Sequence, residues 1–305
     1  MSASPIRRGA VKLPSRITAY GKPGSCKTTF GAFAPKPIFS MTRSETGLMT
    51  LLENNLVPET VDYFPVSDTW EGLLSNIEYL RKNKTDHKTY VIDVVNGAER
   101  LCHEHVCKTN PKFGGNWSSF LDFGRGFGVS SPLWADFFTQ LDLLRIERFM
   151  GIILLAHSKV KRINNPDGDD YDKHIPDITE AGWQPLMRWS DMILFLHHER
   201  TVVKDGSKRK TALSGRKIYT CDAAAFDAKN RIGLPSEIEI PDGDPAQTFL
   251  AFQNAVKATR AARAANAAAT AEPTIPPSTE NEPQTLQEAM TAQEEKAKLL
   301  ETSNA

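Results

Sequence analysis

The sequence contains little cysteine and no long apolar run. Four cysteines stand among 305 residues, too few for the disulfide framework of a small secreted domain. No secretory leader pattern is present, and no stretch reaches the roughly 18 consecutive apolar residues that indicate a membrane-spanning helix. We therefore expect a reducing, cytoplasmic setting without membrane contact, and one sizeable domain with an appendage.

The sequence also lacks net charge, because 37 basic residues balance 37 acidic ones. The two signs are unevenly distributed. Residues 1–22 hold five basic residues and no acid, residues 200–217 hold seven basic residues and one acid, and the segment from Glu272 onward holds seven glutamates and two lysines. Such basic patches either meet a nucleic-acid backbone or form an ordinary solvated surface, and charge alone does not decide between them.

Alternating strand and helix patterns predict an α/β fold with a mostly parallel central sheet flanked by helices. Short apolar segments predict strands at residues 16–20, 37–42, 62–66, 88–95, 151–156 and 191–196. A basic hairpin turning near residues 204–207 would extend this sheet as an antiparallel arm. Composition predicts four regions: a flexible basic N-terminus (1–13), the core (14–243), a C-terminal helix (244–270) and an acidic disordered tail with room for a short helix (271–305).

Two stretches between these elements predict irregular structure. Residues 109–131 combine glycines with aromatic residues, whose rings would either stack on nucleobases or pack beneath the domain. Ser131-Pro132 would then begin a long helix. The polar residues that follow His157, up to about Glu180, predict a mobile loop.

One segment nearly matches the phosphate-binding loop G-x-x-x-x-G-K-[ST]. Gly21, Lys27 and Thr28 match, and Cys26 stands where the second glycine belongs. In such a loop, backbone amides wrap the phosphates, the lysine neutralises β- and γ-phosphate oxygens, and the threonine hydroxyl binds Mg²⁺. The strand expected before the segment and the helix expected after it favour this interpretation over an ordinary Gly/Pro turn. The candidate nucleotide-binding residues are Gly21, Lys22, Pro23, Gly24, Ser25, Cys26, Lys27, Thr28 and Thr29.

Polar residues end two of the predicted core strands. Asp93 closes the apolar run at residues 88–95, and His157 follows the strand at residues 151–156. The carboxyl ends of parallel strands meet at one edge of a sheet, so both side chains would lie near the loop. Asp93 would there help to order Mg²⁺, although on its own it predicts only a strand that ends in a turn. His157 is either positioned to sense a γ-phosphate or a satisfied strand-end histidine.

Taken in order, these segments resemble the phage-encoded ATP-binding proteins with a shortened RecA-type core, distant relatives of RecA and RadA. The resemblance rests on Gly21–Thr29, Glu45-Thr46-Gly47, Tyr90–Val95, Phe123–Gly128, Ala156-His157-Ser158-Lys159, Asp191 and Ala228-Lys229-Asn230-Arg231. It covers about residues 14–242 and implies a RecA-like P-loop NTPase core. It also implies Mg²⁺-dependent ATP hydrolysis, stimulated by DNA, in a protein that binds single-stranded DNA and supports phage recombination or annealing in the host cytoplasm.

The resemblance further implies roles for individual residues of the loop and the strand ends. Lys27 and Thr28 would hold the triphosphate and Mg²⁺, and Asp93 would order the metal through water. Glu45 matches the place of the carboxylate that activates water, so it is the candidate general base. His157 would act as a sensor that contacts the γ-phosphate and transmits its presence to the basic segment that follows in the chain.

A second set of roles concerns assembly. Lys229 and Arg231 resemble a Lys-Asn-Arg motif of RadA-like proteins, which implies a role at the ATP site or at a subunit interface. ATP in this family commonly lies between neighbouring protomers, so a homo-oligomer is implied. A single-strand-binding protein is a further candidate partner.

The departure at Cys26 leaves more than one function open. Glycine is normally needed where a phosphate loop turns through positive φ, so a cysteine there would strain the loop by about 1 kcal/mol. Slow hydrolysis is therefore expected. The alternatives are a protein that anneals or scaffolds DNA around a static nucleotide, and a helicase-loader or motor-type ATPase.

Overall fold

The computed structural model describes residues 9, 11–166, 168–205 and 208–270. The chain divides into two compact units, Met1–Ala261 and Ala262–Ala305. The first unit contains the sheet and the candidate site. In the second, the structure describes residues 262–270, which belong to helix α8 (Gln247–Thr270). The predicted tail at residues 271–305 and most of the predicted N-terminal segment lie outside the described residues.

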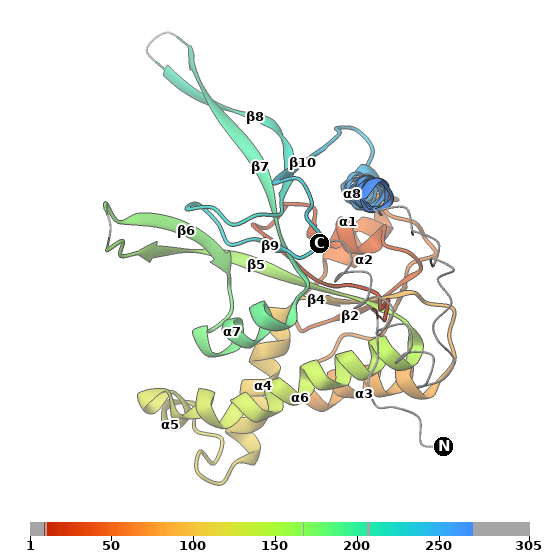
Figure 1. The fold of residues 1–305 in the computed structure, drawn as a ribbon. Helices are drawn as coiled ribbons and strands as arrows, with labels where there is room; N and C mark the ends of the chain where they lie inside the picture. The colour runs from red at the N-terminus through yellow and green to blue at the C-terminus, as the bar shows by residue number, and fades with distance from the viewer. Residues whose placement is uncertain (1–8, 10, 167, 206–207, 271–305) are drawn as a thin grey trace, which may run out of the picture. The chain divides into compact units, whose positions relative to one another are not determined.

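Within the described residues, ten strands form one mixed sheet (Figure 1). They are β1 (Arg16–Gly21), β2 (Pro37–Met41), β3 (Asp62–Tyr63), β4 (Thr89–Asp93), β5 (Gly151–Ile163), β6 (Tyr171–Pro176), β7 (Met192–Asp205), β8 (Lys208–Tyr219), β9 (Lys229–Asn230) and β10 (Glu237–Ile240). The order is β10-β8-β7-β1-β5-β4-β2-β3, with β6 beside β5 and β9 beside β7. The strands from β7 to β3 in this order pair in parallel, and the other pairs are antiparallel. The predicted α/β fold with an antiparallel hairpin is confirmed.

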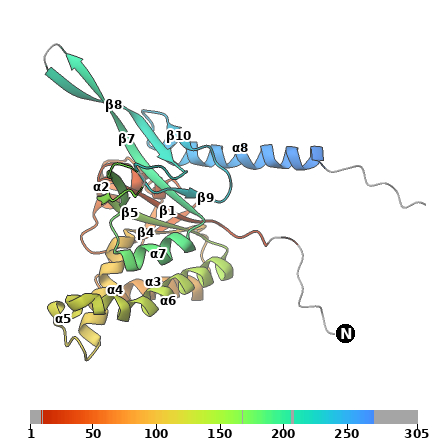
Figure 2. The same ribbon diagram turned by 60° about the vertical axis from the view of Figure 1, so that its left-hand side comes forward.

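Helices cover both faces of the sheet (Figures 1 and 2). Besides α8, they are α1 (Lys27–Ala32), α2 (Gly47–Glu53), α3 (Trp70–Lys82), α4 (Val95–Thr109), α5 (Trp117–Leu121), the 3₁₀ helix η1 (Asp122–Gly124), α6 (Arg125–Arg148) and α7 (Glu180–Trp189). Helices α3, α4, α6 and α7 pack on one face, and α1, α2 and the first turns of α8 pack on the other. None of the helices in the described ranges is both long enough and apolar enough to cross a membrane.

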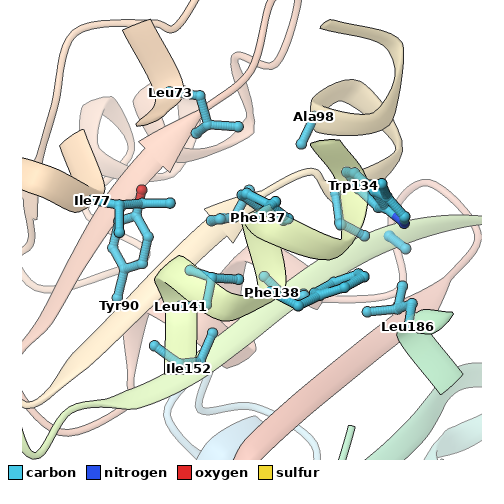
Figure 3. Packing of buried hydrophobic residues seen from close by; sticks show 14 of the residues in the cluster. Leu73, Ile77, Tyr90, Ala98, Trp134, Phe137, Phe138, Leu141, Ile152 and Leu186 are labelled. Carbon is cyan, nitrogen blue, oxygen red and sulfur yellow. The ribbon is translucent and has the colours of Figure 1, made fainter. Parts of the chain in front are cut away.

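The core has two layers because alternate residues of each central strand face opposite sides of the sheet. In β4, Tyr90 and Ile92 join the cluster under α3 and α6, whereas Val91 joins the cluster under α1. All five residues of β4 are buried, as expected of a parallel strand covered on both faces. Figure 3 shows the first cluster, in which Phe137 and Leu141 of α6 lie against the sheet.

The loop prediction for residues 109–131 is wrong from residue 117 onward, where α5, η1 and α6 follow one another. Helix α6 begins at Arg125, well before the predicted start at Ser131. Packing explains the longer helix. A Cβ at Gly126 would clash with the ring of Phe120, so this glycine lets α6 lie directly on α5. The contact outweighs the local preference of Pro132 for a first helical turn.

The aromatic residues of this region mostly pack inside the protein. Phe113 is 6 % exposed and Phe120 is fully buried. Trp117 stacks on Phe120 with ring centroids 4.7 Å apart. Only Phe123, among the aromatic residues of this stretch, is almost fully in solvent, at 94 % exposure. The packing interpretation therefore holds for the main part of the cluster.

Strand β5 continues past His157 to Ile163 and pairs with β6, so most of the segment predicted as a mobile loop is a second hairpin. Its strands lack the apolar alternation that marks a half-buried strand. Ion pairs join them instead, including Arg162 with Asp172 at 3.5 Å. Polar cross-strand pairs of this kind stabilise a hairpin without an apolar signal in the sequence.

Candidate functional site

The predicted phosphate-binding segment connects β1 to α1 at the carboxyl edge of the parallel strands (Figure 1). Gly21 ends β1 and lies opposite His157 of β5. Asp93 ends β4, which is the next strand along the sheet. Ligands of open α/β folds bind at this edge, beyond the carboxyl ends of the strands.

The backbone of the loop is tightly curved. A Cβ at Gly21 would clash with the backbone oxygen of Leu196 and with Ser25 Oγ, so this position requires glycine. Gly24 has a φ of 78°, in the left-handed region that favours glycine. Ser25 is 5 % exposed, and its hydroxyl has no hydrogen-bond partner among the described residues. The loop thus holds a buried hydroxyl to which the described part of the chain supplies no partner.

Cys26 adopts the conformation for which the motif uses glycine. Its φ of 64° and ψ of 23° place it in the left-handed region, immediately before α1. For a residue with a Cβ this conformation costs about 1–2 kcal/mol. The side chain lies near two groups of the β7–β8 hairpin, with Sγ 3.9 Å from His198 Nε2 and 3.8 Å from Arg216 Nη1.

Replacing Cys26 by glycine is expected to raise nucleotide turnover. Relief of about 1 kcal/mol in the phosphate-bound loop corresponds to about a fivefold increase. Steady-state phosphate release by the purified variant measures this. Cys26→Ala is the matched control, because it removes the thiol but keeps a Cβ at positive φ, and its turnover should stay near that of the unmodified protein. A Cys26→Gly variant with no gain would show that the loop conformation does not limit the reaction.

Lys27 lies within the curve of the loop and is 6 % exposed. Its ammonium donates hydrogen bonds to the backbone oxygens of Gly21 at 3.1 Å and Lys22 at 3.0 Å. Burial lowers the pKa of Lys27, although the nearby carboxylates of Asp93 and Glu45 act in the opposite direction. A buried cation whose hydrogen bonds within the described residues go to neutral carbonyl groups has charge left to bind an anionic ligand.

Thr28 and Asp93 meet directly. The Thr28 hydroxyl donates a 2.7 Å hydrogen bond to Asp93 Oδ2, and Asp93 is 2 % exposed. The pKa of Asp93 is raised to about 6, mainly by burial; the hydrogen bond from Thr28 acts in the opposite direction, and the charge of Glu45 adds to the effect of burial. The carboxyl group therefore stands in a site where the charged form is costly unless a cation is close.

Glu45 and His157 form a second pair at the same edge. Glu45 follows β2, and its Oε1 lies 3.0 Å from His157 Nε2. The segment that carries Glu45 abuts the loop, because a Cβ at Gly47 would lie 3.2 Å from Thr28 Oγ1. The structure thus brings together the loop, Asp93, Glu45 and His157, all of which are sequence candidates.

Three residues near the site were not among the sequence candidates. Asn96 Oδ1 accepts a 3.2 Å hydrogen bond from the backbone N–H of His157. His198 and Arg216 face each other across β7 and β8 and reach Cys26. Asn96 lies three residues after Asp93, so its position just beyond a predicted strand end could have identified it. His198 and Arg216 come near the loop because β7 lies beside β1, and no local pattern in the sequence indicates that neighbour.

Lys229 and Arg231 are not brought to the loop within one chain. Strand β9 pairs with the first residues of β7, near the amino-terminal end of β1. The Lys229 ammonium donates to the backbone oxygens of Met187 at 2.6 Å and Ser190 at 2.8 Å. These residues therefore do not belong to the same-chain phosphate site, and their role at a subunit interface stays a prediction.

The groups at this edge fit a nucleotide with Mg²⁺. The loop offers the unpartnered Ser25 hydroxyl and the Lys27 ammonium to phosphate oxygens. Thr28 and Asp93 offer oxygen atoms, the ligand type that Mg²⁺ prefers. Within the described ranges, no group of three or more histidine, cysteine or acidic side chains is arranged to hold a metal. Mg²⁺ suits this donor set, since it usually keeps several waters and binds protein through one or two groups plus substrate phosphates.

Comparison with known families agrees with this assignment. A family model described as an AAA domain matches residues 13–232, which is more than half of the chain and includes every group described above. No curated protein matches the sequence.

Proposed function

The chain belongs to the AAA-domain family, which has an AAA/P-loop ATPase-type domain, and from this premise we propose that it binds and hydrolyses ATP with Mg²⁺ in support of DNA recombination or annealing. The observation that carries the proposal is the convergence of Lys27 and the Thr28–Asp93 pair with the Glu45–His157 pair at one edge of the sheet. Nucleotide binding follows from the family, and Mg²⁺-dependent hydrolysis is supported by this geometry. The role in DNA recombination or annealing rests on the resemblance described above and on the positive charge of the β7–β8 hairpin.

Each group then has a specific task. Lys27 would leave its two carbonyl partners, or share them, to neutralise the outer phosphates. Thr28 and Asp93 would hold Mg²⁺, which when bound neutralises charge on the phosphate oxygens. Glu45 would accept the proton of the attacking water, and His157 would orient its carboxylate through the 3.0 Å contact.

Single-stranded DNA is the proposed partner, bound by the β7–β8 hairpin. Both this hairpin and β5–β6 extend beyond the edge of the sheet (Figure 1). The basic residues of β5–β6 are already paired with acids, as Lys161 is with Glu180 at 3.0 Å and Lys173 with Asp227 at 2.7 Å. Nearer the turn of the β7–β8 hairpin, residues 200–210 hold five basic residues and one acid. Excess positive charge of this kind binds phosphate backbones without sequence preference.

Assembly is part of the proposal. Lys229 and Arg231 lie away from the loop of their own chain, which is compatible with contact to a neighbouring protomer. We therefore propose a homo-oligomer with ATP between protomers, acting in a host cytoplasm together with a single-strand-binding protein. A helicase-loader or motor role uses the same site and differs only in the partner.

A second candidate function is a scaffold that anneals DNA around a nucleotide it does not hydrolyse. The left-handed conformation of Cys26 favours it, because backbone strain in the phosphate loop would slow turnover. The two functions share nucleotide and DNA binding and differ in phosphate release.

An ATPase assay with and without single-stranded DNA separates these functions. We expect Mg²⁺-dependent phosphate release that rises at least about tenfold with DNA, because binding at the hairpin shifts the site toward its competent geometry. The Lys27→Ala variant should release none, which excludes a contaminating ATPase. Reversal of Lys208, Arg209 and Lys210 to glutamate should remove the DNA stimulation and spare the basal rate. DNA binding without any phosphate release would support the scaffold instead.

A further inference from the structure

Two side chains of the β7–β8 hairpin approach the phosphate loop from one side, and the candidate catalytic groups approach it from the other. Asp93, Glu45 and His157 come from β4, from the end of β2 and from β5. His198 and Arg216 come from β7 and β8, across β1 from those strands. The loop itself lies at the end of β1, between the two groups.

Arg216 is held in place yet has donor capacity to spare. Its side chain is 15 % exposed, with Nη2 donating to Pro241 O at 2.6 Å and Nε 3.4 Å from Asp242 Oδ1. The remaining nitrogen, Nη1, points to Cys26 Sγ at 3.8 Å. Sulfur is a weak acceptor, whereas a guanidinium has five N–H donors in a planar fork that matches phosphate oxygens. One arm of this fork is thus directed at the loop without a strong acceptor among the described residues.

The arrangement of the site sets the direction of a bound nucleotide. Thr28 and Asp93 would hold the metal of the outer phosphates, and Glu45 would hold the water that attacks the last of them. The terminal phosphate therefore belongs on the β4 and β5 side. The other end of the nucleotide then extends over Cys26 toward β7 and β8.

We propose that Arg216, assisted by His198, binds the phosphate group next to the ribose of a nucleoside di- or triphosphate and so ties the β7–β8 hairpin to nucleotide occupancy. The inference rests on the proposed function and adds a contact that the phosphate-loop motif does not contain. The side chain of Cys26 lies against both residues, so Cys26 would be next to the proposed phosphate contact.

Calorimetric titration with Mg-ATP and with Mg-ADP tests the proposal. The variant Arg216→Gln keeps an amide donor for Pro241 O. It is expected to bind both nucleotides more weakly, by a similar factor of about ten or more, because a hydrogen bond to a charged phosphate is lost in each case. Arg216→Lys should recover part of the loss, since the charge returns without the fork. Lys217→Ala is the matched control: adjacent strand residues face opposite sides, and Lys217 contacts Glu199 and Glu237 instead of the loop.

The outcomes separate this inference from the function on which it rests. Unchanged affinity of Arg216→Gln for both nucleotides would overturn it, and so would a loss confined to ATP, which would place Arg216 at the terminal phosphate. If the unmodified protein bound neither nucleotide, the proposed function would fail and this inference with it. Thermal unfolding without nucleotide, compared for Arg216→Gln and the unmodified protein, shows whether any loss arises from a damaged fold.

Discussion

Replacing Glu45 by glutamine is expected to lower ATP turnover by about 100-fold to 10,000-fold, the range that general-base catalysis contributes. Glutamine has nearly the same shape and can still hydrogen-bond to His157, which lies 3.0 Å from the carboxylate. It cannot accept the proton of the attacking water. The loop and the Thr28–Asp93 pair do not depend on this proton transfer, so the affinity for Mg-ATP should change little.

Single-turnover hydrolysis combined with calorimetric binding measures the two quantities separately. The control is Glu53→Gln at the exposed end of α2, which changes the net charge equally and should leave both unchanged. If Glu45→Gln turned over at the normal rate, another group would have to accept the proton. If Glu45→Gln also lost affinity for Mg-ATP, Glu45 would contribute to nucleotide binding and would not act as the general base alone.

The parts of the site that follow a local rule could be predicted from the sequence. The loop has a spaced motif, and Asp93 ends a continuous apolar run, so its position at the strand end follows from local pattern alone. His157 was placed at a strand end in the same way, whereas Glu45 became a candidate through the family resemblance. Their contact was not predictable, because it depends on how the loop after β2 approaches the end of β5 across the intervening β4.

The elements that the sequence did not reveal are those set by long-range packing. Helix α6 reaches back to Arg125 because Gly126 accommodates the ring of Phe120, and no local propensity encodes that fit. The β5–β6 hairpin is joined by ion pairs in place of apolar alternation. Arg216 comes to the loop only because β7 lies beside β1 and β8 beside β7, an order that no short segment specifies.

Family membership does not settle how Cys26 affects the reaction. In a loop with glycine at this position the backbone can adjust as phosphates bind and leave. Cys26 instead adopts the left-handed geometry at an energetic cost and places a side chain against His198 and Arg216. Binding and turnover can therefore respond differently to changes in this loop, and a test of binding alone is needed beside the kinetic ones.

Replacing Lys27 by methionine provides that test and should abolish stabilisation by nucleotide. Loss of two charge-assisted hydrogen bonds to phosphate is expected to weaken Mg-ATP binding by about 100-fold or more. At a concentration of 100 times Kd, bound ligand adds about 2.7 kcal/mol to the free energy of unfolding. For a domain of this size that corresponds to a rise in Tm of about 5–10 °C, which the variant should lose almost entirely.

Without nucleotide the same variant should unfold at nearly the normal temperature, since two contributions oppose each other. Methionine keeps the volume of the lysine stem and removes the cost of burying an ammonium, the cause that lowers the pKa of Lys27. It also leaves the backbone oxygens of Gly21 and Lys22 without a donor. Thermal unfolding with and without Mg-ATP measures both effects, with Lys82→Met on the exposed side of α3 as the matched control. A nucleotide-induced shift that survived in Lys27→Met would place the binding site away from this loop.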